Sequence, residues 1–121
     1  MVKNKKTVLI AEDDTTILEA ISMILEMENY NVVTTTGDIS LIKKTRPDLI
    51  LLDIMMSGID GRKICKKLKA DKEFKNIPII IVSASREIKK LAKEAGANDF
   101  LAKPFEMDEL LKLANKYTNA N

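Results

Sequence analysis

Acidic side chains follow two short apolar runs of the sequence, where they could bind a cation or attack phosphorus. Glu12 and Asp13 come directly after Thr7–Ala11, and Asp53 ends the run that begins at Leu49. Clustered carboxylates repel one another and raise one another's pKa, and a hard cation such as Mg²⁺ relieves that repulsion. A carboxylate can also act as a nucleophile and form an aspartyl phosphate. The pattern predicts metal-assisted phosphoryl transfer, in which Asp53 attacks phosphorus while Asp13, with Glu12 directly or through water, holds the metal.

Two further apolar runs end in a hydroxyl and an ammonium group. Ser83 follows Ile79–Val82, and Lys103 follows Asp99–Ala102. Phosphoryl transfer depends mainly on positioning, on a metal, and on positive or hydrogen-bond-donating groups around the transferred oxygens. We therefore expect Ser83 and Lys103 to hold the phosphoryl oxygens, and the small side chain of Ala84 leaves room for that group.

The composition excludes several kinds of chemistry. The chain has 121 residues and no histidine, which excludes Ser-His and Cys-His nucleophile pairs, most zinc enzymes and a phosphohistidine carrier. A single cysteine, Cys65, rules out an internal disulfide and fits a reducing compartment. A net charge of +2 without a DNA-binding motif gives no support for direct contact with nucleic acid. No apolar run approaches the ~20 residues of a membrane helix, so we expect a cytoplasmic protein with no membrane partner.

Five strands alternating with five helices must position these groups. Strands are predicted at Thr7–Ala11, Val32–Thr35, Asp48–Asp53, Ile79–Val82 and Asp99–Ala102. Helices are indicated by the apolar spacing within Ile17–Leu25, Ile39–Ile42, Ile64–Leu68, Ile88–Ala95 and Met107–Ala114. Such alternation implies parallel strands joined by right-handed crossovers. We expect an α/β fold: a flavodoxin-like, doubly wound (βα)5 domain with five parallel strands in the order 2-1-3-4-5 and helices on both faces.

This strand order brings the chemical groups together. The first, third and fourth strands are neighbours, and the fifth lies beside the fourth. Because parallel strands end at the same edge of the sheet, one shallow pocket should hold three carboxylates, one hydroxyl and one ammonium group. The whole chain, residues 1–121, is predicted to be a single domain with its core at about residues 6–117.

Four segments, in order and at family-like spacing, resemble the receiver domains of bacterial two-component response regulators, of the single-domain, chemotaxis-regulator-like kind. They are VLIAEDD, DLILLDIMMSGIDG, IIIVSAS and AGANDFLAKPF, and the resemblance extends from Thr7 to about Tyr117. It implies that Asp53 is the phosphorylated residue. It also implies a metal site for Mg²⁺ or Mn²⁺ whose ligands are Glu12, Asp13, Asp53 and the backbone carbonyl of Met55.

The resemblance further implies a switch. Ser83 would be the switch hydroxyl, Phe100 the switch aromatic and Lys103 the lysine of the site, with a cis bond between Lys103 and Pro104. A sensor histidine kinase or a histidine phosphotransfer protein would supply the phosphoryl group, as in a phosphorelay. Phosphorylation would then reshape the surface made by the helix at Ile88–Ala95, the strand at Asp99–Ala102 and the last helix, for an unknown downstream protein or for homodimerisation.

The sequence departs from the family pattern in three places. Met56 and Ser57 stand where a proline usually precedes the glycine, which predicts a looser loop after Asp53. The segment between Tyr30 and Pro47 is shorter than usual by roughly one helical turn, which predicts a short or irregular second helix. The switch aromatic is phenylalanine rather than tyrosine and therefore has no hydroxyl.

Other interpretations stay open. Asp53 and Ser83 could instead be helix caps, Asp14 or Thr15 could cap the first helix, and Phe100 could fill the core. A degenerate receiver would act as a phosphorylation-independent protein-interaction module. We expect that the protein is not an enzyme in the usual sense and catalyses only its own phosphorylation and dephosphorylation.

Two enzyme-like or ligand-binding classes fit the residues less well. An aspartate-nucleophile phosphatase needs a second aspartate two residues after the nucleophile, where this chain has Met55. A flavin- or nucleotide-binding module needs a phosphate-cradling loop after the first strand, where this chain has three acids. The polar end of the chain favours a stand-alone receiver over a domain cut from a longer regulator.

Overall fold

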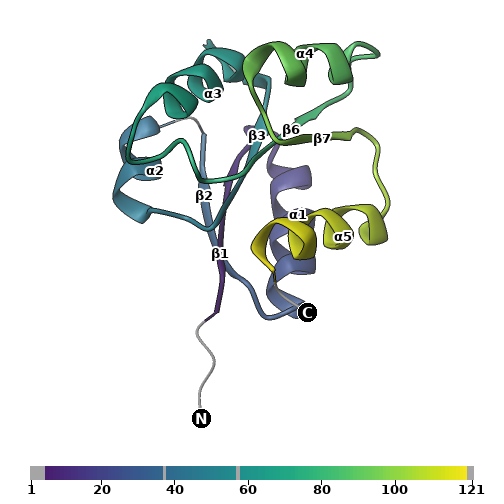
Figure 1. Ribbon diagram of the computed structural model, residues 1–121. Coiled ribbons are helices and arrows are strands. Elements are labelled where there is room, and N and C mark those ends of the chain that lie inside the picture. The colour runs from purple at the N-terminus through teal and green to yellow at the C-terminus, as the bar shows by residue number, and fades with distance from the viewer. Residues whose placement is uncertain (1–4, 37, 57, 120–121) are drawn as a thin grey trace.

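A computed structural model describes residues 5–36, 38–56 and 58–119 (Figure 1). Its main sheet has five parallel strands in the order β2-β1-β3-β6-β7. Counted along the chain, these are the five predicted strands in the predicted order 2-1-3-4-5. Their bounds are β1 Thr7–Ala11, β2 Asn31–Thr35, β3 Leu49–Asp53, β6 Ile79–Ser83 and β7 Asp99–Ala102.

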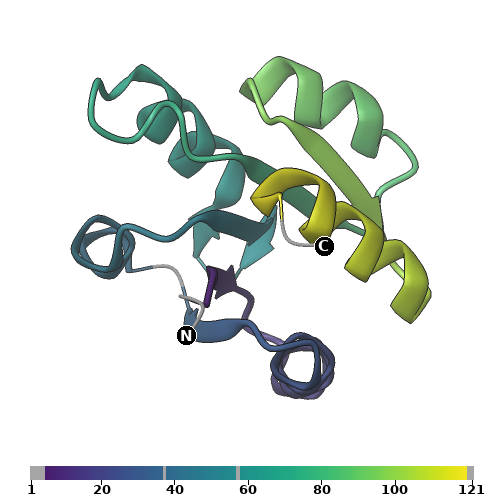
Figure 2. The same cartoon turned by 60° about the horizontal axis from the view of Figure 1, so that its bottom comes forward.

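Helices cover both faces of this sheet, as Figure 2 shows. One layer holds α1 and α5, and the other holds α2, α3 and α4. The predicted doubly wound α/β fold is therefore confirmed. The helix bounds are α1 Thr15–Met27, α2 Ile39–Thr45, α3 Gly61–Ala70, α4 Ile88–Ala95 and α5 Met107–Thr118.

The apolar runs of the two central strands have a direct structural cause. Every residue of β3 and β6 is buried. Successive side chains of a strand point to opposite faces, so Leu49 and Leu51 pack with the α1–α5 layer while Ile50 and Leu52 pack with the α2–α4 layer. A strand covered on both faces has no position where water would favour a polar residue. Asp53, the last residue of β3, is also buried, but its carboxylate lies beside the other polar groups at the edge of the sheet.

Helix α1 starts directly after the acidic loop because Asp14 caps it. The Asp14 carboxylate accepts hydrogen bonds from the backbone N–H groups of Thr16 and Ile17. Of the two predicted caps, Asp14 and Thr15, the structure uses Asp14. This early helix start leaves Glu12 and Asp13 as the short connection between β1 and α1, which fixes both acids at the edge of the sheet.

The segment after Asp53 differs from the prediction of a looser loop. Two short strands, β4 Met55–Met56 and β5 Ile59–Asp60, pair antiparallel and form a hairpin. Ser57, the other residue of the predicted loop, lies outside the described residues. The short second helix was expected, and α2 has seven residues. Within the described ranges, every helix is too short or too polar to span a bilayer.

Candidate functional site

Four strand ends bring the predicted residues to one edge of the sheet. Asp53 and Ser83 are the last residues of β3 and β6, Glu12 and Asp13 follow β1, and Lys103 follows β7. The strand register aligns these ends, because Ala11 pairs with Leu52, Asp53 with Val82, and Ser83 with Ala102. The sequence-based placement of the site at the carboxyl edge of the sheet therefore agrees with the structure.

The three acids form one cluster. Carboxylate oxygens of Glu12, Asp13 and Asp53 all lie within 4.8 Å of one another. Glu12 is 2% exposed and Asp53 is 5% exposed, so neither charge is well solvated. Glu12 Oε2 accepts a hydrogen bond from the backbone N–H of Asp14 at 3.1 Å, whereas its buried Oε1 accepts no hydrogen bond from the described residues.

Lys103 is the cation that faces this cluster. Its Nζ lies 2.7 Å from Glu12 Oε1 and 3.4 Å from Asp53 Oδ2. The shorter contact is an ion pair without the angles of a hydrogen bond. Burial acts to lower the pKa of Lys103, but the contacts with Glu12 and the charge of Asp53 together raise it. The ammonium group therefore stays charged and is shared between two carboxylates.

The environment of Asp53 raises its pKa to about 6. Burial is the main cause, and the neighbouring Glu12 carboxyl adds to it. The backbone N–H of Met55, which donates to Asp53 Oδ1 at 3.1 Å, and the charge of Lys103 act in the opposite direction. One ammonium group does not neutralise three carboxylates.

A divalent cation fits this set of residues. Oxygen ligands from one or two carboxylates are what Mg²⁺ takes in proteins. The cluster offers three carboxylates, and the buried Oε1 of Glu12 has the ion pair with Lys103 but no well-aligned hydrogen bond from the described residues. A cation would offset the repulsion from Glu12 that adds to the raised pKa of Asp53. The contribution of the Met55 carbonyl stays a prediction.

Ser83 is buried at 3% exposure, and its Oγ accepts a hydrogen bond from the backbone N–H of Ser85 at 3.0 Å. Its backbone carbonyl accepts from the backbone N–H of Lys103 at 2.8 Å, which ties the ends of β6 and β7 together. The alternative role of Ser83 as the cap of α4 is wrong, because the residue at that cap is Glu87.

A cavity of about 480 Å³ lies over the acceptor. Asp53, Ser83 and Lys103 line it together with Ile54, Met55, Arg62, Ala84, Ser85 and Leu91. Ala84 lines the cavity as the predicted small residue. Arg62 was not predicted from the sequence, since its place in this cavity depends on the hairpin that precedes α3.

Phe100, the predicted switch aromatic, is the second residue of β7. It is half-buried on β7 and packs against the apolar cluster of the α2–α4 layer, so the structure shows the side chain filling core space. Its role as a switch stays a prediction. The peptide bond between Lys103 and Pro104 is cis, as the resemblance implied.

Gly61, the first residue of α3, lies against the backbone of the acceptor Asp53. A Cβ atom at this position would lie 2.2 Å from the Asp53 carbonyl oxygen. The Gly61 N–H also donates to the Ile54 carbonyl at 2.9 Å. The lack of a side chain at Gly61 lets α3 start against the end of β3.

Comparisons of sequence and of structure lead to one family. The family described as "Response regulator receiver domain" matches residues 8–115. The DNA-binding dual master transcriptional regulator RpaA of Synechocystis sp. is 35% identical over 109 residues, which cover 86% of this chain and 45% of RpaA. The chain thus spans about half the length of the curated relatives that it matches.

Two solved structures show the similarity in three dimensions. A putative response regulator from Chloroflexus aurantiacus is 33% identical with a TM-score of 0.90, and the match covers 96% of this chain and 99% of that one. The receiver domain of the sensor histidine kinase PA1611 from Pseudomonas aeruginosa is 25% identical with a TM-score of 0.85, over 97% of this chain and 100% of that one.

Proposed function

Because the chain belongs to the response regulator receiver domain family, we propose that Asp53 accepts a phosphoryl group from a partner sensor histidine kinase or histidine phosphotransfer protein. The observation that carries this proposal is the cluster at the sheet edge, where Asp53 lies beside Glu12, Asp13 and Lys103. An Asp53 oxygen attacks phosphorus, the bond from phosphorus to the donor's imidazole nitrogen breaks, and an acyl phosphate forms on Asp53.

Glu12, Asp13, Asp53 and the backbone carbonyl of Met55 would hold Mg²⁺ or Mn²⁺. The metal would neutralise charge on the transferred phosphoryl oxygens. The PA1611 receiver domain has a magnesium ion coordinated in its active site cleft, which supports this part of the proposal. Lys103 and Ser83 line the cavity together with Asp53, and their Nζ and Oγ atoms donate hydrogen bonds to phosphoryl oxygens once the group is attached.

The output surface is formed by α4, β7 and α5. Ser83 and Lys103 are joined through their backbones, so movement of either toward a phosphoryl group pulls on the ends of β6 and β7. Phe100 on β7 then moves into the space that Ser83 leaves. The changed surface binds a downstream protein or a second copy of the chain.

The activity is confined to the chain itself. The protein catalyses its own phosphorylation and dephosphorylation and acts on no separate substrate. It works in the cytoplasm through protein–protein contacts, without direct contact of this domain with nucleic acid. The alternative, a phosphorylation-independent interaction module, requires that the acidic cluster has no chemical role.

Intact mass measured after incubation with acetyl phosphate tests the acceptor. With Mg²⁺ we expect the wild type to gain the mass of one phosphoryl group, and without a divalent metal we expect no gain. Asp53→Asn removes the nucleophile and should abolish the gain, while Asp108→Asn, an exposed acid in the first turn of α5, should retain it. A gain in Asp53→Asn would overturn the assignment, and no gain with any metal would favour the interaction module.

Magnesium binding can be tested apart from phosphorylation. Mg²⁺ should raise the midpoint of thermal unfolding at pH 7.5, because it binds the folded state only. Asp13→Asn removes a carboxylate ligand and should weaken the apparent affinity by about tenfold or more. The matched control is Asp14→Asn, because asparagine caps a helix as well as aspartate does. Equal loss of Mg²⁺ affinity in both variants would argue against Asp13 as a ligand.

A further inference from the structure

Arg62 is a second cationic side chain at the acceptor cavity, and the proposed function gives it no role. It is the second residue of α3, and it lines the cavity that also holds Asp53, Ser83 and Lys103. In this structure its guanidinium group binds Asp60, with Nε 3.1 Å from Oδ1 and Nη2 3.0 Å from Oδ2. Arg62 is thus close to the acceptor but occupied by another carboxylate.

The Arg62–Asp60 pair is bidentate, but it lies partly in solvent. The side chains are 45% and 30% exposed, and an ion pair at the surface contributes little because water competes for both partners. Among the described residues, Asp60 is the one carboxylate within ion-pair distance of Arg62. A stronger anion that arrives in the neighbouring cavity can therefore displace Asp60.

A phosphoryl group on Asp53 is such an anion. The planar fork of a guanidinium group matches phosphate oxygens as well as it matches a carboxylate, and phosphate carries more charge. Lys103, the other cation of the cavity, is already shared between Glu12 and Asp53. The phosphoryl group thus brings negative charge that Lys103 alone does not neutralise.

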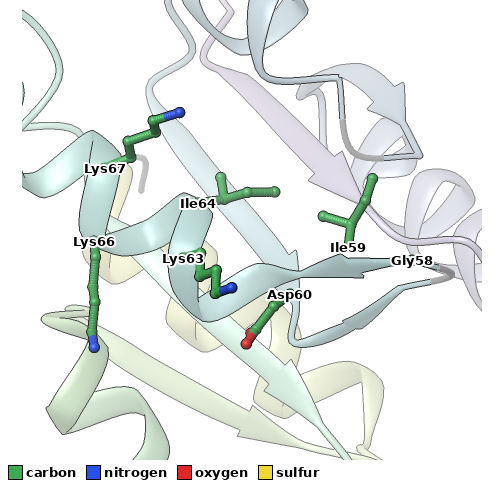
Figure 3. Close-up of a pocket in the computed structure, with 7 residues that line it drawn as sticks. All are labelled: Gly58, Ile59, Asp60, Lys63, Ile64, Lys66 and Lys67. Atoms are coloured by element: carbon green, nitrogen blue, oxygen red, sulfur yellow. The ribbon is translucent and has the colours of Figure 1, made fainter.

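Asp60 has a substitute partner if Arg62 leaves. Figure 3 shows the side chains of Asp60 and Lys63 on the same side of the ribbon, beside a pocket that Ile59 and Ile64 also line. Hydrogen bonding from Arg62 is the main cause of the lowered pKa of Asp60, and the charge of Lys63 adds to it. The backbone N–H of Arg62 donates to Asp60 Oδ1 at 2.9 Å, so Asp60 can keep its place as the cap of α3.

We propose that Arg62 is an anion-binding residue of the acceptor site, which leaves Asp60 and donates hydrogen bonds to the phosphoryl group of the donor and of phosphorylated Asp53. This inference rests on the proposed function of Asp53. It makes Asp60 a competitor of the phosphoryl group, so removal of Arg62 and removal of the Asp60 charge have opposite effects on phosphorylation. A purely structural ion pair would give effects of the same direction, because either change breaks the pair.

The test is the rate of phosphorylation by acetyl phosphate at a subsaturating concentration, followed by intact mass with Mg²⁺ present. We expect Arg62→Gln to slow phosphorylation by about five- to tenfold, and Arg62→Lys to retain an intermediate rate. Asp60→Asn, which preserves a helix-capping side chain, should accelerate phosphorylation. The control is Lys67→Gln, which removes one charge from the same helix at a position outside the acceptor cavity.

Thermal unfolding of each variant shows whether it is folded at the assay temperature. A rate for Arg62→Gln equal to that of Lys67→Gln would overturn the inference, as would slower phosphorylation in both Arg62→Gln and Asp60→Asn. In those cases the wild type is still phosphorylated and the proposed function stands. A wild type that takes up no phosphoryl group would overturn the proposed function and this inference together.

Discussion

Gly61→Ala should lower the free energy of unfolding by about 3 kcal/mol, near the upper end of the cost of forcing extra atoms into a packed site. The added Cβ would lie 2.2 Å from the Asp53 carbonyl oxygen and 3.0 Å from Ile54 Cα, and both are backbone atoms that no rotamer change can move. The start of α3 must therefore shift away from the end of β3. Because β3 carries Asp53, phosphorylation should also slow.

Gly58→Ala is the matched control for the Gly61 substitution. Gly58 has a positive φ of 71°, and a Cβ there would meet nothing within 4 Å. Its replacement should cost about 1 kcal/mol from backbone conformation alone, and phosphorylation should continue at the wild-type rate. Urea unfolding of the two variants separates the cost of the steric contact at Gly61 from the cost of the backbone conformation at Gly58. Similar losses of stability in both would show that α3 adjusts without strain at Gly61.

Asp53→Asn should stabilise the protein at pH 7.5 in the absence of divalent metal, by about 2 to 3 kcal/mol. The pKa of Asp53 is about 6 in the folded protein against a reference value of 3.8. The folded state therefore binds this proton more tightly than the unfolded state does. The stability that the proton provides is complete below pH 3.8 and is lost as the pH rises through 6. Asparagine keeps a neutral side chain at every pH and avoids that loss.

The difference in stability between wild type and Asp53→Asn should consequently shrink below about pH 4, where the wild-type carboxyl is protonated. Asp71→Asn provides the opposite case. Hydrogen bonding from the backbone of Glu73 lowers the pKa of Asp71. Loss of the Asp71 carboxylate should therefore destabilise the protein at pH 7.5 and have a smaller effect in acid, where the carboxyl is protonated. Urea unfolding across this pH range measures both effects. A destabilised Asp53→Asn at pH 7.5 would show that the charged carboxylate is favourable in the folded state.

The main elements could be predicted because the pattern that defines them is local. A continuous apolar run such as Leu49–Leu52 is typical of a strand buried on both faces, and the alternation of strands and helices restricts the topology to few arrangements. Site residues that directly follow strands, such as Asp13 and Lys103, were placed by the same reasoning. Their position depends on where a strand ends and not on side-chain conformation.

The remaining features depend on contacts between residues whose sequence pattern carries no signal. The β4–β5 hairpin has two residues in each strand, too few for an alternating pattern to be recognised. The sequence therefore predicts a loop at Ile59 and Asp60, where the structure has a strand. The place of Arg62 in the acceptor cavity follows from that hairpin, and the requirement for glycine at Gly61 follows from a distance to backbone atoms of another element.

The burial of β3 also implies that this strand and the adjacent β4–β5 hairpin open at different free-energy costs. All five residues of β3 are buried, and the strand is paired to β1 on one side and to β6 on the other. Amide hydrogens in such a strand exchange with solvent only when the whole domain opens, whereas the small hairpin beside it opens locally at far lower cost. We therefore expect the amide hydrogens of β3, the strand that ends at Asp53, to exchange more slowly than those of Met55, Met56, Ile59 and Asp60 in the hairpin.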